Sequence, residues 1–231
     1  MMKIRGFIEG FYNRKPKKND YGFENSNITH YIYAPKEDSY IRQKWRLKDK
    51  SLEARCIPKN IAQVYTLSPG ADFNRKSKKD FNFLLSKFNF AIDKGFSEVG
   101  LLFDDIDINN IGIESDDKDL GKFHGELISE VTTKLGLSNG WFCPSIYCQS
   151  FSKKGIQNDK YLEGVSETIN NDLFFLWTGP KVISDFISQD HLKELGQVIK
   201  NPVVIWDNFY ANDYCPTRLF LGDITGRDFF R

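Results

Sequence analysis

The chain has 231 residues, of which 40% are hydrophobic and 15% aromatic, enough for one large domain with a filled core. Its 32 Lys and Arg residues nearly balance its 31 Asp and Glu residues, and this net charge of +1 argues against a nucleic-acid or anionic-membrane partner. Because no run of about eighteen apolar residues and no leader-like segment is visible, we expect no membrane association, a cytoplasmic location and reduced thiols at the four scattered cysteines.

Short β-prone apolar runs recur along the chain, and each ends in a polar or turn residue. Seven runs predict strands at Ile4–Ile8, Thr29–Ala34, Ala62–Leu67, Glu98–Phe103, Trp141–Tyr147, Leu173–Trp177 and Val203–Trp206. Helical patterns lie between several of them, at Asp80–Lys94, Lys118–Leu135 and about Gln189–Lys200. The apolar face expected for the first helix consists of Phe81, Leu84, Leu85, Phe88 and Ile92.

The alternation of strands and helices predicts an α/β fold with parallel strands, either an open doubly wound sheet or a closed barrel. Polar and turn residues decide between the two, because they follow nearly every strand. They are Glu9, Lys36, Ser68-Pro69-Gly70, Asp104-Asp105, Tyr147, Thr178-Gly179-Pro180 and Asp207-Asn208. In a TIM-type (β/α) barrel all these strand ends meet at one mouth, where catalytic groups lie. We therefore predict a single barrel domain over residues 1–231.

Two adjacent carboxylates, Asp104 and Asp105, follow the fourth predicted strand. Crowded like charges and partial burial raise the pKa of at least one of them, which suits a proton donor for a leaving-group oxygen. A calcium loop starting at Asp105 is an alternative, but Asn110 replaces its glycine and a strand precedes it where a helix is required. A solvated acidic loop is the other alternative.

Further candidates have both a functional and a structural interpretation. Tyr147, Trp177 and Trp206 could form an apolar wall for a sugar, although such aromatics also occur as plain core. Lys36 is either a surface lysine or, together with the acids, a donor to a substrate hydroxyl. The three histidines His30, His124 and His191 have no metal-ligand spacing, so we expect them to be structural or exposed.

Seven motifs in this order and spacing resemble glycoside hydrolase family 84, which contains the protein O-GlcNAcases and hyaluronidase-type β-N-acetylglucosaminidases. The motifs, which run nearly from end to end of the chain, are Gly6-Phe-Ile-Glu-Gly-Phe-Tyr12, Tyr31-Ile-Tyr-Ala-Pro-Lys-Glu-Asp38, Ser68-Pro-Gly70, Leu101-Leu-Phe-Asp-Asp-Ile-Asp107, Phe142-Cys-Pro-x-x-Tyr-Cys148, Leu176-Trp-Thr-Gly-Pro180 and Ile205-Trp-Asp-Asn-x-x-Ala-Asn-Asp-Tyr214.

The resemblance implies a retaining β-N-acetylglucosaminidase in which the sugar's own 2-acetamido oxygen attacks the anomeric carbon, without a metal or organic cofactor. By the family pattern, Asp104 would orient the acetamido N–H, and Asp105 would protonate the glycosidic oxygen and then deprotonate water. The matching substrate contacts are the Gly6 backbone and Lys36 for the 3-hydroxyl, Asp213 for the 4- and 6-hydroxyls, and Tyr147, Trp206 and Asn208 around the acetamido group.

The match also departs from the family pattern. An eighth strand, which carries a sugar-binding asparagine in the family, has no counterpart before Arg231, so we expect a barrel incomplete at its C-terminus. Asn13 stands where the family commonly has glycine. The alternative function is therefore a catalytically impaired relative that binds N-acetylglucosamine, or a fragment that needs a partner chain. An open barrel edge makes homo-oligomers a further hypothesis. The sequence leaves three kinds of aglycone open, an O-GlcNAc-modified protein, a polysaccharide or a small glycoside.

Overall fold

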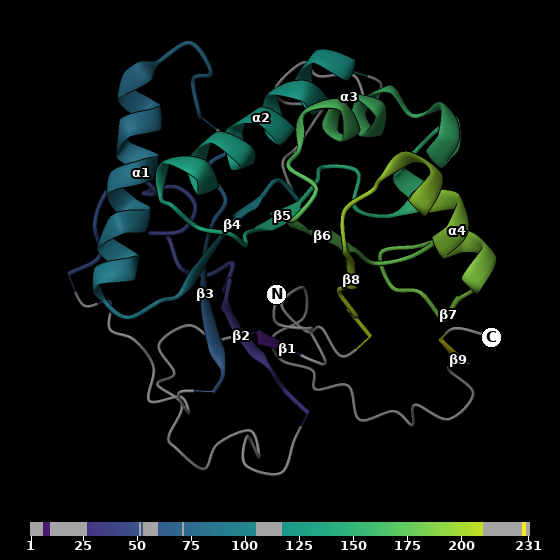
Figure 1. Cartoon of the computed structure of the whole chain (residues 1–231), viewed down its shortest axis with the longest axis horizontal. Coiled ribbons are helices and arrows are strands. Elements are labelled where there is room, and N and C mark those ends of the chain that lie inside the picture. The colour runs from purple at the N-terminus through teal and green to yellow at the C-terminus, as the bar shows by residue number, and fades with distance from the viewer. Residues whose placement is uncertain are drawn as a thin grey trace. The chain divides into compact units, whose positions relative to one another are not determined.

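A computed structural model describes residues 7–9, 27–50, 52, 60–70, 72–104, 117–209 and 228–229 (Figure 1). Each of the seven predicted strands is present. The strand at Ala62–Leu67 has the predicted bounds, the first strand, Phe7–Glu9, ends one residue later than predicted, and the other five are shorter. The chain forms two compact units, Met1–Phe103 with Val131–Trp141, and Asp104–Glu130 with Phe142–Arg231. We describe them in turn as the first and the second unit.

Parallel strands form the sheet of the first unit, and each pairs with the next strand in the sequence. These strands are β1 (Phe7–Glu9), β2 (His30–Tyr33), β3 (Ala62–Leu67) and β4 (Glu98–Leu102). The register places Tyr33 beside Tyr65 and Leu67 beside Leu101. Every residue of β4 is buried, as expected for a parallel strand that is covered on both faces.

Helix α1 (Lys78–Asp93) begins at an N-cap, Ser77, whose hydroxyl oxygen accepts a hydrogen bond from the Asp80 N–H. Its buried face consists of Asp80, Leu84, Lys87, Phe88 and Ala91. This corrects the apolar face expected from the sequence, because Phe81, Leu85 and Ile92 are only half-buried. The helix is rotated so that a lysine, rather than those three apolar side chains, lies fully in the interior.

A polar cluster at the start of the strands joins His30, Glu98 and Trp141. The Trp141 Nε1–H donates to Glu98 at 2.6 Å, and the His30 ring lies edge-on to the indole with 5.1 Å between centroids. Burial raises the pKa of Glu98, but polar interactions with the side chains of His30, Trp141 and Asn139 together outweigh this effect and hold the pKa below its ordinary value. The cluster ties three strand starts together within the first unit.

The strands of the second unit are ordered β5-β6-β8. Their bounds are Trp141–Cys143 for β5, Phe174–Trp177 for β6 and Val203–Ile205 for β8. Helices α2 (Lys118–Lys134) and α4 (Gln189–Val198) confirm two predicted helices. Elements that were not predicted are α3 (Lys160–Thr168), the 3₁₀ turns Gln149–Phe151 and Ile156–Asn158, and the parallel pair β7 (Phe186–Ile187) and β9 (Asp228–Phe229).

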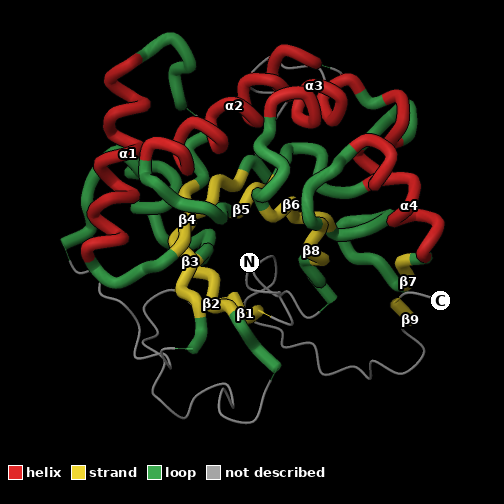
Figure 2. Tube along the Cα trace, viewed as in Figure 1, coloured by secondary structure: helices red, strands yellow, loops and turns green. Residues whose placement is uncertain are grey.

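Helices α2 and α3 approach so closely that glycines are required where they meet. A Cβ atom on Gly121 would overlap the Tyr161 carbonyl oxygen, and one on Gly164 would overlap that of Lys118. At the exposed edge of the pair, Lys118 lies 2.6 Å from both Glu163 and Glu167. In both units the helices lie outside the strands, as in the wall of a β/α barrel (Figure 2).

Candidate active site

The carboxyl ends of three strands in the second unit remain bonded beyond the strands themselves. The Thr178 N–H donates to the Tyr147 carbonyl oxygen at 2.9 Å, and the Trp206 N–H donates to the Trp177 carbonyl oxygen at 2.9 Å. These bonds place Tyr147 and Trp206 on either side of the segment that follows β6. Two of the predicted sugar contacts are thus brought to neighbouring strand ends, as the barrel prediction requires.

The aromatic side chains at these ends fall into two kinds. Trp177 is fully buried, and its Nε1–H donates to His191 Nε2 at 2.9 Å, so it belongs to the core and not to a sugar wall. Trp206 is only half-buried. Tyr147 is 8% exposed, and its ring meets that of Phe151 edge-on with centroids 4.9 Å apart. Tyr147 and Trp206 therefore remain the candidates for stacking against a ligand.

Asn208 lies two residues after Trp206, and its side chain is held by the loop that follows β6. Its Nδ2 group donates to the Val182 carbonyl oxygen at 3.2 Å. The same loop is braced by Thr178, whose hydroxyl donates to the Lys181 carbonyl oxygen at 2.8 Å. Because the Asn208 contact uses only one N–H hydrogen, the amide retains capacity for another hydrogen bond.

Asp104 follows Phe103, is half-buried and begins the second unit. Three other predicted site residues, Gly6, Asp105 and Asp213, lie outside the described residues, as does the segment considered as a calcium loop. Of the predicted set, the structure thus places Asp104, Tyr147, Trp206 and Asn208 in one unit and Lys36 in the other.

Lys36 occupies the tight turn that follows β2, where the Asp38 N–H donates to the Pro35 carbonyl oxygen at 3.0 Å. The buried Asp38 carboxylate anchors the turn. It accepts hydrogen bonds from the Tyr33 hydroxyl at 2.7 Å and from the Tyr40 N–H at 2.8 Å. The half-buried Lys36 therefore belongs to a turn that is tied back to its own strand.

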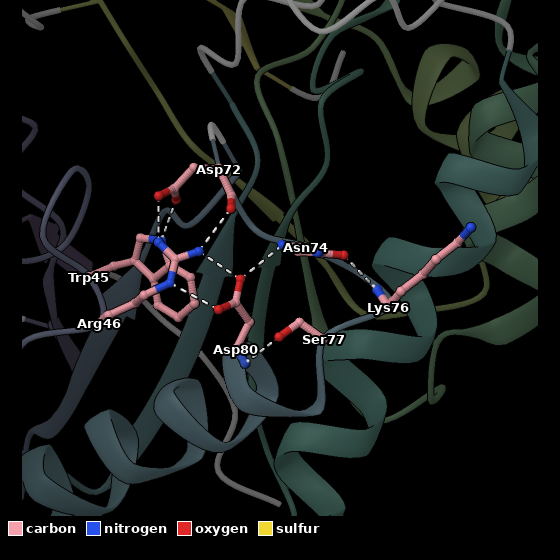
Figure 3. Close-up of polar contacts among 7 residues, drawn as sticks. All are labelled: Trp45, Arg46, Asp72, Asn74, Lys76, Ser77 and Asp80. Atoms are coloured by element: carbon pink, nitrogen blue, oxygen red, sulfur yellow. Dashed lines mark hydrogen bonds and ion pairs between the residues drawn. The ribbon is translucent and has the colours of Figure 1, made fainter.

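An ionic cluster that the sequence did not predict joins the segments that follow β2 and β3 to the start of α1 (Figure 3). Arg46 donates to the carboxylates of Asp72 and Asp80, and its guanidinium lies 4.2 Å from the centroid of the Trp45 ring. The Trp45 Nε1–H also donates to Asp72, at 2.7 Å. The Arg46 hydrogen bond holds the pKa of Asp80 below its ordinary value. No sequence motif marks this cluster, because its members are about 26 to 34 positions apart.

The three histidines are structural, which confirms the expectation. His30 belongs to the Glu98 cluster, His124 lies 2.9 Å from the Tyr161 hydroxyl, and His191 accepts from Trp177. Within the part of the chain that the structure describes, no three His, Cys, Asp or Glu side chains gather as potential metal ligands. None of the described helices has the length and apolar character needed to cross a bilayer.

Comparison with known proteins identifies the family. The family model of β-N-acetylglucosaminidases, NAGidase, matches residues 5–229. The protein O-GlcNAcases of Rattus norvegicus and Mus musculus are each 34% identical to this chain over 239 aligned residues. The alignment covers 96% of this chain but 26% of each relative, so the chain spans about a quarter of their length.

Solved structures share the fold. CpGH84B aligns with a TM-score of 0.76 and 24% identity over 99% of this chain and 44% of its own. A mutant O-GlcNAc hydrolase of Thermobaculum terrenum aligns with a TM-score of 0.66 and 24% identity, over 81% of this chain and 42% of its own. The parallel strands and outer helices are thus part of a TIM-type α/β barrel, and the chain belongs to the β-N-acetylglucosaminidase family that its motifs predicted.

Proposed function

We propose that the chain hydrolyses terminal N-acetyl-β-glucosaminides, and that residues 1–231 act as one catalytic domain of the TIM-barrel type. The observation that carries the proposal is the family match over residues 5–229, which includes both aspartates after β4. The placement of Tyr147, Trp206 and Asn208 at neighbouring strand ends supports a binding site for the acetamido group.

The proposed mechanism is substrate-assisted and retaining. Asp104 accepts the acetamido N–H and so directs the acetamido oxygen to the anomeric carbon, while Asp105 gives a proton to the departing oxygen and later takes one from water. Tyr147 and Trp206 would contact the acetamido group with Asn208. The Gly6 backbone and Lys36 would hold the 3-hydroxyl, and Asp213 the 4- and 6-hydroxyls.

The substrate would carry N-acetylglucosamine at its non-reducing end, and an O-GlcNAc-modified protein is the aglycone we favour because the curated relatives are named protein O-GlcNAcases. We also propose a cytoplasmic location for this activity, in keeping with the wide scatter of the four cysteines along the sequence.

The proposal is tested by hydrolysis of a fluorogenic aryl N-acetyl-β-glucosaminide. We expect turnover by the wild type and a loss of about a hundredfold or more in Asp104→Asn, because intermediate formation needs the acetamido group oriented. Asp119→Asn, at an exposed position in the first turn of α2, is the matched control and should retain full activity. A folded wild type without turnover would overturn the proposal.

Asp105→Asn separates the acid role from the orienting role. An activated aryl leaving group departs without a proton, whereas an alkyl leaving group needs one. We expect the variant to lose far more activity toward an alkyl glycoside than toward the aryl glycoside. Equal losses on both substrates would contradict the assignment of Asp105.

A further inference from the structure

Lys87 is the one fully buried lysine among the residues that the structure describes. Its ammonium group lies under residues 35–50, which we call the Lys36 loop. The Nζ atom donates to the carbonyl oxygens of Tyr40, at 3.1 Å, and Leu47. It also lies 5.2 Å from the centroid of the Tyr40 ring. One side chain of α1 thus binds two points of the loop that are seven residues apart.

A buried ammonium group is costly unless its donors are used, so this arrangement needs a reason. Burial lowers the pKa of Lys87 to about 8, and the nearby carboxylates of Asp38 and Asp49 offset only part of that effect. A leucine or methionine would fill the same interior space without this penalty. What such a side chain could not supply is a donor for the loop carbonyls.

The contacts of Lys87 lead to Lys36 in a few steps. One of the two carbonyls that Lys87 binds belongs to Tyr40, and the Tyr40 N–H donates to the Asp38 carboxylate. The Asp38 N–H in turn closes the turn that carries Lys36. Asp38 is also bound by the hydroxyl of Tyr33, the last residue of β2. The far end of the loop is held separately, where Arg46 binds Asp72 and Asp80 (Figure 3). Asp80 belongs to the first turn of α1, so Lys87 is a second link between the loop and this helix, one that reaches the part of the loop close to Asp38.

We propose that Lys87 is a positioning residue, which binds the carbonyls of Tyr40 and Leu47 so that the Lys36 loop presents Lys36 to the sugar. The proposal rests on the proposed function, because it assigns Lys87 to the same reaction through Lys36. A positioning residue differs from a lysine that only stabilises the fold. If Lys87 positions Lys36, the effect of its removal on hydrolysis must depend on the presence of Lys36.

The holding of the loop is tested first, without reference to activity. Amide hydrogen exchange is compared in the wild type, in Lys87→Met and in Lys78→Met, a control at an exposed position on the same helix. We expect amides of the Lys36 loop to exchange at least about tenfold faster in Lys87→Met, with β3 and β4 unchanged, and no change in the control. Unchanged exchange in the loop would overturn the proposal.

The link to Lys36 is tested by a double-mutant cycle of Lys87→Met and Lys36→Ala on the aryl glucosaminide. We expect Lys87→Met to lower kcat/KM about tenfold, mainly through KM, when Lys36 is present, and to have almost no effect in the Lys36→Ala background. Equal losses in both backgrounds would show a merely structural role and overturn the positioning assignment.

If circular dichroism shows that Lys87→Met is unfolded, both measurements are made on Lys87→Gln. This variant keeps an amide donor for one carbonyl, so we expect smaller changes of the same kind. No turnover by folded wild type would overturn the proposed function, and the exchange experiment would then alone decide whether Lys87 holds the loop.

Discussion

The Lys36 loop and the α2–α3 pair are fixed by opposite means. In the loop, irregular backbone leaves carbonyl groups that need donors, and Lys87 provides them, while Arg46 of the loop binds the carboxylates of Asp72 and Asp80. In the helix pair, the backbone groups are already bonded within each helix. Gly121 and Gly164 carry no side chain, and this allows the backbones of α2 and α3 to come into direct contact. The Lys36 loop therefore depends on charged side chains, whereas these helices depend on empty space at the Cβ positions.

The largest effect is expected where that space is filled. Gly164→Ala would drive its new methyl group into the Lys118 carbonyl oxygen, which is backbone and cannot swing aside. We expect the free energy of unfolding to fall by about 3 kcal/mol, measured by urea denaturation. Gly196→Ala is the control, because nothing lies within 4 Å of its Cβ position in α4. It should gain about 0.5 to 1 kcal/mol from better helix propensity. A decrease in the free energy of unfolding for both variants would contradict the explanation that close helix contact excludes a side chain at Gly164.

A pH-dependent effect is expected for Lys87. Its pKa is 10.5 ordinarily and about 8 in the folded chain, so between these values the unfolded chain binds more protons. The stability of the wild type relative to Lys87→Met should therefore increase by about 3 kcal/mol as pH rises through this window. Denaturation of both proteins at several pH values measures the difference. A difference that stays constant would show that the folded pKa is not lowered.

Removal of the Arg46 guanidinium should have a smaller effect. Arg46→Met leaves the buried Asp80 carboxylate without its main partner, and we expect a loss of about 2 kcal/mol near neutral pH. The contribution of Asp80 is present above its unfolded pKa of 3.8 and is lost as pH falls through its lower folded pKa, so the loss should shrink in acid. Arg42→Met, on the same loop, is the control. Equal losses in the two variants would contradict a specific role for Arg46.

The smallest effect is expected at the surface of the helix pair. Lys118→Met removes ion pairs to Glu163 and Glu167, which are solvent-exposed and weakly stabilising. We expect a smaller decrease in Tm than for Arg46→Met, and its disappearance in about 1 M salt. A decrease that persists in high salt would indicate that the lysine acts through packing.

The strand order of this fold could be predicted from sequence, and part of the site with it. Strands such as β4 contain an uninterrupted apolar run, here from Val99 onward, and the family motifs lie at the ends of such runs. Helix α3 was missed because its apolar residues Tyr161, Leu162 and Val165 extend over a single turn and a half, and Gly164 lies among them. Two-residue strands such as β7 leave no periodicity to detect.

The contacts that hold the Lys36 loop could not be predicted, because their partners are distant in sequence. Lys87 hydrogen bonds to carbonyls 40 and 47 positions away, and backbone acceptors leave no trace in the residue types. One signal was present, since Lys87 adjoins Phe88 and lies three positions from Leu84 on the face that is buried. The apolar face predicted for α1 did not include that lysine and included Phe81, Leu85 and Ile92 instead, which are only half-buried.

The Glu98 cluster has a consequence for synthesis of the chain on the ribosome. Glu98 lies in β4, but the indole that donates to it belongs to Trp141, more than forty residues later. Until Trp141 has emerged, the first unit would have to bury this carboxylate without that donor, which is unfavourable. The four strands at the N-terminus can therefore pair as they appear, but their core is completed only after α2 has been made.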